Sequence, residues 1–280
     1  MLRSISILTL STLLLLLTLL NNVKASTGGC NKTPRLTSGV QTTTVNGKHR
    51  RWTLRIPSNY NNRRPYRFIF GLHWLNGDMT AVAGGSAPYY GLESLANESA
   101  IFVAPDGLNK GWANQNGEDV TFLDTIRKQV DEELCVDETL RFSVGFSYGG
   151  AMSFSLACSH AQEYRAIAVL SGATLSGCAG GNEPIAFYGQ HGVKDSVLPI
   201  DLGSQIRDRF VRMNGCQAKT ALEPARGSRR RITTVYEGCE YPTQWTAFDG
   251  DHVALPGEAG NDGGAQSWTP REVWRFFSQF

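Results

Sequence analysis

Gly145-Phe146-Ser147-Tyr148-Gly149 is the stretch that decides the fold of this chain. Residues 140–144 before it have the β-branched and aromatic character of a short strand, and the small residues at 150–157 after it favour a helix. A serine between a strand and a helix lies on a sharp turn that presents its hydroxyl above the sheet. The motif in this setting predicts that Ser147 is a nucleophile. The alternative is a glycine-rich turn in which Ser147 only caps the helix.

Alternating strand and helix patterns surround this motif. Residues 40–45 and 51–56 flank Asn46-Gly47, which is a strong signal for an antiparallel hairpin. Further strands are predicted at 68–72, 101–104, 166–170, 184–188, 232–235 and 243–248, and helices at 90–100, 120–130, 202–212 and 270–280. A hairpin followed by repeated strand–helix units indicates an α/β fold, doubly wound around a mostly parallel sheet with an N-terminal antiparallel hairpin.

A nucleophilic serine needs a base and an orienting carboxylate. In the α/β-hydrolase architecture these follow the serine in the order acid, then histidine, each on a loop after a later strand. Asp195 follows the strand predicted at 184–188, and His252 follows the strand at 243–248. The order therefore assigns Asp195 as the acid and His252 as the base.

Other residues compete for these roles. Asp201, Asp249 and Asp251 are rivals for the acid, because turn aspartates near a catalytic histidine are common. His191 would have to precede the acid in sequence, against the order of the fold, and is better interpreted as a structural or pocket-wall residue. A solvated loop histidine is the alternative for His252.

The reaction also requires an oxyanion hole of two backbone amides. The amide of Tyr148, next to the nucleophile, is one candidate. The loop that follows the strand at 68–72 supplies the other, with Leu75 preferred and Trp74 next. The Trp74 ring is also a candidate to lie across an aromatic substrate, although ordinary packing at the strand end explains it as well.

The N-terminus predicts the compartment. Arg3 precedes an apolar run from Ile5 to Leu20, and small residues at Val23 and Ala25 fit a secretory signal peptide, residues 1–25, cut before Ser26. The run is short for a membrane span, which leaves an uncleaved anchor as the alternative. With no second run of this kind, the mature chain, residues 26–280, is expected to be secreted, free of the membrane and a single domain.

Six cysteines fall in the mature part, and in an exported chain they predict up to three disulfides. They are Cys30, Cys135, Cys158, Cys178, Cys216 and Cys239. Fifteen pairings are possible, of which Cys216 with Cys239 is the best single pair because the two bracket one excursion of the chain. Asn31 and Asn97 begin glycosylation sequons.

Charge argues against a nucleic-acid partner. Removing residues 1–25 discards Arg3 and Lys24 and no acidic residue, so 27 − 2 = 25 basic residues face 25 acidic ones. The one basic cluster, Arg226 with Arg229 to Arg231, lies in a Gly-Ser segment and is interpreted as a solvated turn.

The chain resembles the secreted, fungal-type feruloyl esterases of carbohydrate esterase family one, which are related to polyhydroxybutyrate depolymerase-like esterases. The resemblance spans nearly all of the mature chain. It is carried by residues 29–30, 72–74, 103–107, 112, 118–120, 122–123, 134–137, 145–152, 156–158, 176–178, 191–192, 195 and 248–252. One departure is Trp74, because many relatives have His-Gly where this chain has His73-Trp74.

The resemblance implies an α/β-hydrolase with Ser147, Asp195 and His252 as nucleophile, acid and base, in agreement with the order argument. It also implies hydrolysis of hydroxycinnamate esters on plant cell-wall arabinoxylan, with no metal or organic cofactor. An acetylxylan esterase or a short-chain polyester depolymerase would use the same three residues. A non-catalytic carbohydrate-binding protein is the alternative outside the esterases, but it does not explain the ordered set.

Overall fold

One nine-stranded sheet organises residues 26–280, the part of the chain that the computed structural model describes. The predicted signal peptide, residues 1–25, lies outside the described residues. The strand order is β1-β2-β4-β3-β5-β6-β7-β9-β8. The strands are β1 Gly39–Val45, β2 Lys48–Arg55, β3 Tyr66–Leu72, β4 Ala100–Pro105, β5 Val136–Phe146, β6 Ala166–Leu170, β7 Ala186–Gly192, β8 Arg231–Val235 and β9 Thr243–Phe248.

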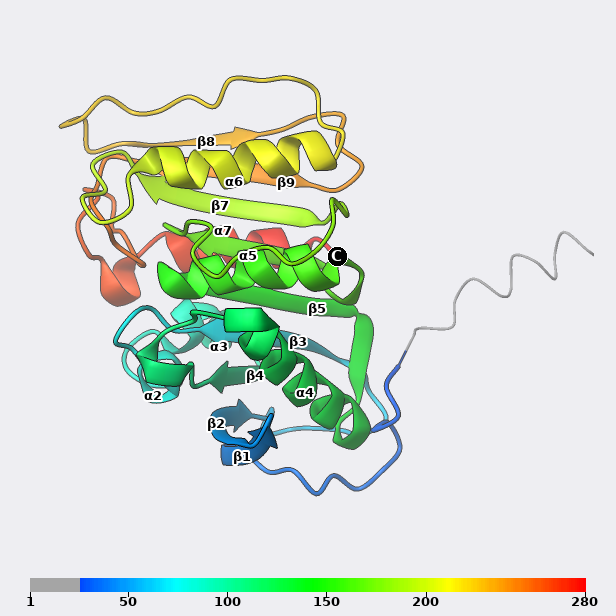
Figure 1. The fold of residues 1–280 in the computed structure, drawn as a ribbon. Helices are drawn as coiled ribbons and strands as arrows, with labels where there is room; N and C mark the ends of the chain where they lie inside the picture. Colours follow the sequence, from blue (N-terminus) through cyan, green and yellow to red (C-terminus); the bar gives the residue numbers. More distant parts are fainter. Residues whose placement is uncertain (1–25) are drawn as a thin grey trace, which may run out of the picture.

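Helices cover both faces of this sheet. In Figure 1, α4, α5 and α6 lie in front of the strands and α7 lies behind them. The α-helices are α2 Met79–Ala83, α3 Leu92–Ala96, α4 Glu118–Glu133, α5 Tyr148–His160, α6 Ile200–Met213 and α7 Thr269–Ser278. Short 3₁₀ segments are η2 Pro88–Gly91, η3 Leu108–Lys110, η4 Gln115–Gly117, η5 Ala161–Glu163 and η6 Gly264–Gln266. The doubly wound α/β class predicted from the sequence is confirmed.

The alternation of strand side chains builds two cores, one on each face. Along β3, Phe68 and Phe70 pack into the core beneath α4, α5 and α6, whereas Ile69 packs into the core of α2, α3 and α7. Successive strand side chains point to opposite faces, so a strand covered on both sides is apolar throughout. This explains why the central strands are continuous apolar runs.

Both edges of the sheet are antiparallel. β1 and β2 form the predicted hairpin, and Asn46 and Gly47 at its turn both have positive φ, 52° and 77°, as a two-residue hairpin turn requires. At the other edge, β8 pairs antiparallel with β9. The direction of β8 was not predicted, because its short sequence pattern carries no information about its pairing.

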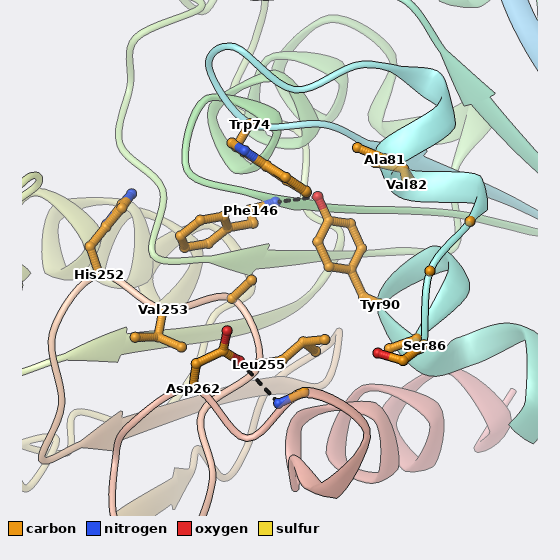
Figure 2. Close-up of a pocket in the computed structure, with 15 residues that line it drawn as sticks. Trp74, Ala81, Val82, Ser86, Tyr90, Phe146, His252, Val253, Leu255 and Asp262 are labelled. Atoms are coloured by element: carbon orange, nitrogen blue, oxygen red, sulfur yellow. Dashed lines mark hydrogen bonds between the residues drawn. The ribbon is translucent and has the colours of Figure 1, made fainter.

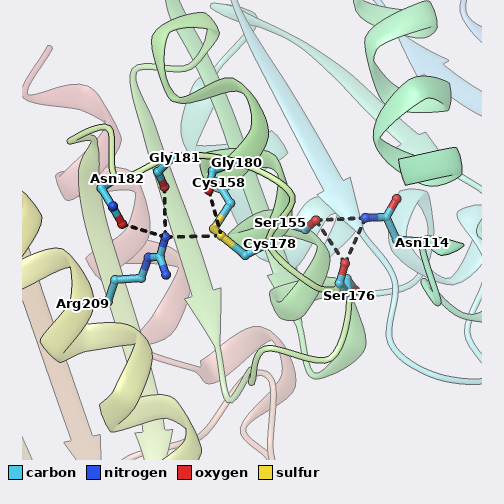
Figure 3. The surroundings of a disulfide bond; sticks show 9 residues. All are labelled: Asn114, Ser155, Cys158, Ser176, Cys178, Gly180, Gly181, Asn182 and Arg209. Carbon is cyan, nitrogen blue, oxygen red and sulfur yellow. Dashed lines mark hydrogen bonds between the residues drawn. A yellow bond between two sulfur atoms is a disulfide. The ribbon is translucent and has the colours of Figure 1, made fainter. Parts of the chain in front are cut away.

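All six cysteines are paired, as Cys30–Cys135, Cys158–Cys178 and Cys216–Cys239. The last is the pair that the sequence favoured, and it encloses β8. Figure 3 shows the second bridge beside Arg209, whose guanidinium donates to Gly181 O at 3.0 Å. Asn31 and Asn97, at the start of the sequons, are both exposed. In the range 26–280, no helix is both long enough and apolar enough to cross a membrane.

The spacing of the bridges predicts unequal contributions to stability. Cys30–Cys135 joins residues 105 apart, whereas Cys216–Cys239 joins residues 23 apart. In the chain-entropy model, closing these loops stabilises the fold by roughly 5 and roughly 3 kcal/mol. Replacing both cysteines of a bridge by alanine should therefore lower the free energy of unfolding, measured in urea, more for Cys30–Cys135. Equal losses, or a larger loss for Cys216–Cys239, would contradict this expectation.

Candidate active site

Ser147 lies on a strained turn between β5 and α5. Its backbone has φ 55° and ψ −118°, a conformation that a residue with a side chain rarely adopts. Ser147 N donates to Leu170 O of β6 at 2.9 Å, which holds the turn against the sheet. The side chain makes no capping hydrogen bond to α5. The structure therefore contradicts the alternative in which Ser147 only caps the helix.

Two glycines of the motif make this turn possible. A Cβ on Gly145 would lie 2.3 Å from the backbone of Gly149, and a Cβ on Gly149 would lie 2.1 Å from Leu72 O of β3. Both separations are far below van der Waals contact. The first turn of α5 thus packs directly on the ends of β5 and β3, and a side chain at either glycine would push Ser147 out of place.

The parallel strands bring the other predicted residues to the end of the sheet where Ser147 lies, the end formed by the carboxyl ends of the strands. β3, β5, β7 and β9 are parallel to one another or to common neighbours, so their carboxyl ends lie together. Trp74 and Leu75 follow β3, and Ser147 follows β5. Asp195 follows β7, and His252 follows β9. Residues more than 170 positions apart therefore converge on one edge.

Asp195 and His252 are in direct contact. His252 Nδ1 lies 2.7 Å from Asp195 Oδ2, and both side chains are largely buried. Facing a carboxylate, Nδ1 carries the proton and donates it. Nε2 is then left with its lone pair, which is the atom that a general base uses to accept a proton from serine.

The environment of Asp195 keeps it ionised. Burial raises its pKa, but hydrogen bonds from His191, His252 and the amide of Leu198 outweigh burial and hold the pKa well below its ordinary value. Oδ1 accepts from Val197 N at 3.0 Å and Leu198 N at 2.7 Å. A carboxylate with this many donors persists as an anion and can stabilise a protonated imidazole.

The rival carboxylates have other partners. Asp251 accepts from Ser196 N at 2.8 Å and from the backbone amide of His252 at 2.7 Å, so it does not touch the imidazole. Asp249 is 3.0 Å from Lys194 Nζ and accepts from Arg229 N at 2.7 Å. Asp201 is an exposed residue in the first turn of α6. None of the three hydrogen-bonds to the ring of His252.

His191 also lies beside Asp195, near the same carboxylate oxygen that His252 contacts. Its Nε2 donates to Leu198 O at 2.7 Å and lies 3.2 Å from Asp195 Oδ2. The ring is fully buried, and a Cβ on Gly203 of α6 would lie 2.2 Å from its Nδ1. His191 therefore has no route to a substrate, and its contacts fix the loop that carries Asp195.

No direct hydrogen bond joins Ser147 and His252, the predicted nucleophile and base, in the described residues, although the residue before Ser147 contacts His252. The rings of Phe146, which precedes Ser147, and His252 have centroids 4.6 Å apart. Across the described part of the chain, no hydrogen bond joins Ser147 Oγ to another side chain. Contacts of this kind are often long without substrate and shorten when substrate binds.

The two amides predicted for the oxyanion hole come from loops that meet beside the turn. A Cβ on Gly111 would lie 2.9 Å from the Tyr148 ring and 3.5 Å from Leu75 Cδ1, so both residues border the same glycine. Within residues 26–280, the amides of Tyr148, Leu75 and Trp74 donate to no acceptor. Free amides at the N-terminus of a helix are suited to an anion. The geometry does not choose between Leu75 and Trp74.

A buried histidine fixes the second of these loops. His73 Nδ1 donates to Trp74 O at 2.7 Å, and its Nε2 accepts from Gly107 N at 2.9 Å. Burial lowers the pKa of His73, so the ring is neutral and holds this tautomer. Trp112 Nε1 donates to His73 O at 2.8 Å. The sequence gives no sign of this role, because Gly107 and Trp112 lie 34 and 39 positions from His73 along the chain.

A second buried network supports Trp112 from the side of the Cys158–Cys178 bridge. Ser176, two residues before Cys178, donates through Oγ to Trp112 O at 2.7 Å. Asn114 donates through Nδ2 to Ser155 Oγ at 3.0 Å and to Ser176 O at 2.9 Å, as Figure 3 shows. The disulfide thus anchors a loop that holds the surroundings of His73.

A cleft of about 530 Å³ opens beside His252. Figure 2 shows Trp74, Phe146 and Tyr90 on one part of its wall and Val253, Leu255 and Asp262 on another. The Trp74 and Phe146 rings meet edge to face, with centroids 6.4 Å apart. Most of the lining is apolar or aromatic, so the cleft is suited to a flat apolar group next to the reacting atoms.

Comparison with known proteins shows close relatives over almost the whole chain. The chain is 51% identical over 283 aligned positions to feruloyl esterase D of Neurospora crassa, covering 96% of each protein. It is 49% identical over 268 positions to a probable feruloyl esterase C of Aspergillus niger, covering 95% of this chain and 96% of the relative. No family model matches the chain.

Solved structures share the fold at low sequence identity. An acetyl xylan esterase from Aspergillus awamori is 12% identical with a TM-score of 0.63, covering 86% of this chain and 99% of its own. A ferulic acid esterase from Anaeromyces mucronatus is 16% identical with a TM-score of 0.52, covering 66% of this chain and 84% of its own. At this identity the likeness concerns the fold alone.

The contacts of the two histidines predict different effects of their removal. His252→Ala removes the base and should lower kcat for p-nitrophenyl acetate by about 10⁴-fold. His191→Ala loosens the Asp195 loop but leaves Asp195 and His252 in place, so measurable turnover should remain. Both variants are compared as folded protein, checked by circular dichroism. An inactive His191→Ala beside an active His252→Ala would reverse the assignment.

Proposed function

Because the chain belongs to the family of fungal feruloyl esterases, we propose that Ser147, His252 and Asp195 hydrolyse its ester substrates through a covalent acyl-enzyme. The contact between Asp195 and His252, on the edge that also carries the strained Ser147, is the observation that carries the proposal. The chain is a serine carboxylic-ester hydrolase, and its substrates are esters of ferulic and related hydroxycinnamic acids.

The first half of the reaction forms the acyl-enzyme. Ser147 Oγ attacks the ester carbonyl while His252 Nε2 accepts its proton, and Asp195 stabilises the imidazolium that results. The carbonyl oxygen becomes an oxyanion, which accepts hydrogen bonds from the amides of Tyr148 and Leu75. The tetrahedral intermediate then collapses, and the alcohol leaves with the proton that His252 returns to it.

The second half releases the acid. Water attacks the acyl-enzyme carbonyl while His252 accepts its proton, and the same two amides stabilise the second oxyanion. Ser147 leaves with the proton from His252, and the free acid departs. The proton steps need Nε2 unprotonated at the start of each half. The ionised Asp195 serves this by holding the other proton on Nδ1.

The cleft beside His252 is proposed to hold the acyl group. A hydroxycinnamoyl group is flat and aromatic, and Trp74, Phe146 and Tyr90 provide aromatic surface along the cleft. An acetyl group would leave most of this volume empty. The cleft therefore favours a hydroxycinnamoyl ester over an acetyl ester.

Asp262 is proposed to recognise the phenolic hydroxyl of the acyl group. It is the one carboxylate among the residues that line the cleft, and its Oδ1 accepts from Gly264 N at 3.0 Å, which orients the side chain. Oδ2 has no hydrogen-bond partner in residues 26–280. A carboxylate oxygen on an otherwise apolar wall is a good acceptor for a phenol.

The natural substrate is proposed to be feruloylated arabinoxylan or its fragments in plant cell walls. The alcohol that leaves is then a sugar hydroxyl, which lies on the solvent side of Ser147 and His252. Three disulfides and exposed sequons support the accompanying proposal that the chain is exported and that residues 26–280 act as one catalytic domain.

A panel of esters tests the acyl preference. Methyl ferulate should be hydrolysed with a kcat/KM at least about tenfold above that of methyl acetate, because burying an aromatic ring lowers the transition-state free energy by more than 1.4 kcal/mol. A methyl hydroxybutyrate ester should be as poor as the acetate. Ser147→Ala gives the background rate. Equal or faster turnover of the small esters would contradict the assignment of the cleft.

The role of Asp262 is tested with two acyl groups that differ at one oxygen. Wild type should prefer methyl ferulate to methyl 3,4-dimethoxycinnamate, which lacks the phenolic donor. Asp262→Ala should lower the ratio of kcat/KM for methyl ferulate to kcat/KM for the dimethoxy ester by roughly tenfold, because a hydrogen bond to a charged acceptor is lost. Glu258→Ala is the matched control, because Glu258 is an exposed carboxylate on the same loop outside the cleft. An unchanged ratio in Asp262→Ala would refute the role.

A further inference from the structure

Two consecutive tyrosines in η2 are held in the left-handed region. Tyr89 has φ 52° and ψ 45°, and Tyr90 has φ 59° and ψ 30°. Bulky side chains avoid this region, and a strained pair persists only where the surrounding structure determines it. Both side chains are buried, with exposed fractions of 1% for Tyr89 and 4% for Tyr90. The sequence gives no sign of this conformation.

The strain places the Tyr90 hydroxyl between two strand ends. It donates to Leu72 O at 2.6 Å and accepts from Phe146 N at 3.3 Å. Leu72 is the last residue of β3, and Phe146 is the last residue of β5. Leu72 and Gly145 are the final pair of the two strands, so the hydroxyl joins the last paired residue of β3 to the residue that follows the last paired residue of β5. Figure 2 shows the ring of Tyr90 reaching from η2 to this point.

The chain beyond each strand end carries catalytic groups. Ser147 and the amide of Tyr148 follow Phe146 directly. The loop with the Leu75 amide begins after Leu72. An oxyanion hole works only when its two donors and the nucleophile are held to within about 0.5 Å of the productive geometry. Here the two donors come from different strands, so their separation depends on how those strands end.

We propose that Tyr90 is a positioning residue that sets the distance between the oxyanion loop after β3 and the nucleophile turn after β5. The hydroxyl acts on both strand ends at once and touches no reacting atom. This inference rests on the proposed function, because the proposed function assigns the two loops their catalytic roles. Burial raises the pKa of Tyr90, so the hydroxyl keeps its proton and remains a donor to Leu72 O at every working pH.

Tyr89 provides a matched comparison within the same turn. It shares the left-handed backbone, and its ring packs against Phe102 with centroids 4.8 Å apart. Its hydroxyl is buried and has no hydrogen-bond partner among residues 26–280. Tyr89→Phe and Tyr90→Phe therefore remove the same atom from neighbouring rings, but only the second change breaks a link between β3 and β5.

The test compares kcat and KM of wild type, Tyr89→Phe and Tyr90→Phe, with methyl ferulate and with p-nitrophenyl acetate. Removal of one oxyanion donor costs roughly 10²–10³-fold in kcat. A displaced donor should cost less, so we expect Tyr90→Phe to lose roughly 10–100-fold in kcat. Its KM should stay within about twofold, because the ring that lines the cleft is retained. Tyr89→Phe should keep the wild-type kcat.

Two further measurements make the result decisive. Titration of reactive serine with a phosphonate reagent gives kcat per active site, so a smaller folded fraction does not imitate the effect. An arylboronic acid, which forms a tetrahedral adduct on serine, should bind Tyr90→Phe more weakly by about the factor lost in kcat/KM. The product acid ferulate should bind both variants equally.

The outcomes separate this inference from the substrate assignment. If the protein hydrolyses p-nitrophenyl acetate but not methyl ferulate, the substrate proposal fails, and the kcat ratios on the acetate still decide the role of Tyr90. If kcat per active site in Tyr90→Phe equals that of Tyr89→Phe, Tyr90 does not position the loops. A rise in KM without a change in kcat would likewise overturn the proposal and assign Tyr90 to substrate binding alone.

Discussion

The close approach of α5 to the ends of β5 and β3 is the constraint on which the rest of this structure depends. Gly145 and Gly149 permit it because each faces backbone atoms where no side chain fits. The approach accompanies the strained backbone conformation of Ser147, and the amide of Tyr148, the first residue of α5, has no helical acceptor. It also brings the loop after β3 beside the serine. Packing of the two cores, one on each side of the sheet, offsets the free-energy cost of this strained conformation.

Around this turn, buried polar residues hold the groups that are proposed to react. His191 and the Leu198 amide fix Asp195, and Asp195 fixes the tautomer of His252. On the other side, His73 and Trp112 fix the loop that follows β3. The buried donors named in these two hydrogen-bond networks have acceptors, whereas His191 Nδ1 has no partner in the described residues. Donors held in this way need little reorganisation when charge develops. The site is therefore largely assembled before substrate binds.

The sequence predicted most of the fold because the central strands are apolar runs with regular spacing. The local motif around Ser147 also predicted its turn between strand and helix. The order of residues along the chain predicted that Asp195 and His252 belong together. The direction of β8, the left-handed Tyr89 and Tyr90, and the tautomer of His73 were not predictable. Each depends on contacts between residues distant in sequence, such as Tyr90 with Leu72 and Phe146. The sequence favoured Leu75 over Trp74 for the second amide, and the structure does not decide between them.

The central claim is that one serine on this turn becomes the covalent attachment point of the substrate. Its most direct test is reaction of the protein with a phosphonylating reagent, followed by peptide mapping with mass spectrometry. The account predicts one adduct per chain, on Ser147, formed in step with the loss of ester hydrolysis and slowed when methyl ferulate is present. Complete loss of hydrolysis with the adduct on another residue, or continued hydrolysis by protein fully labelled at Ser147, would contradict it.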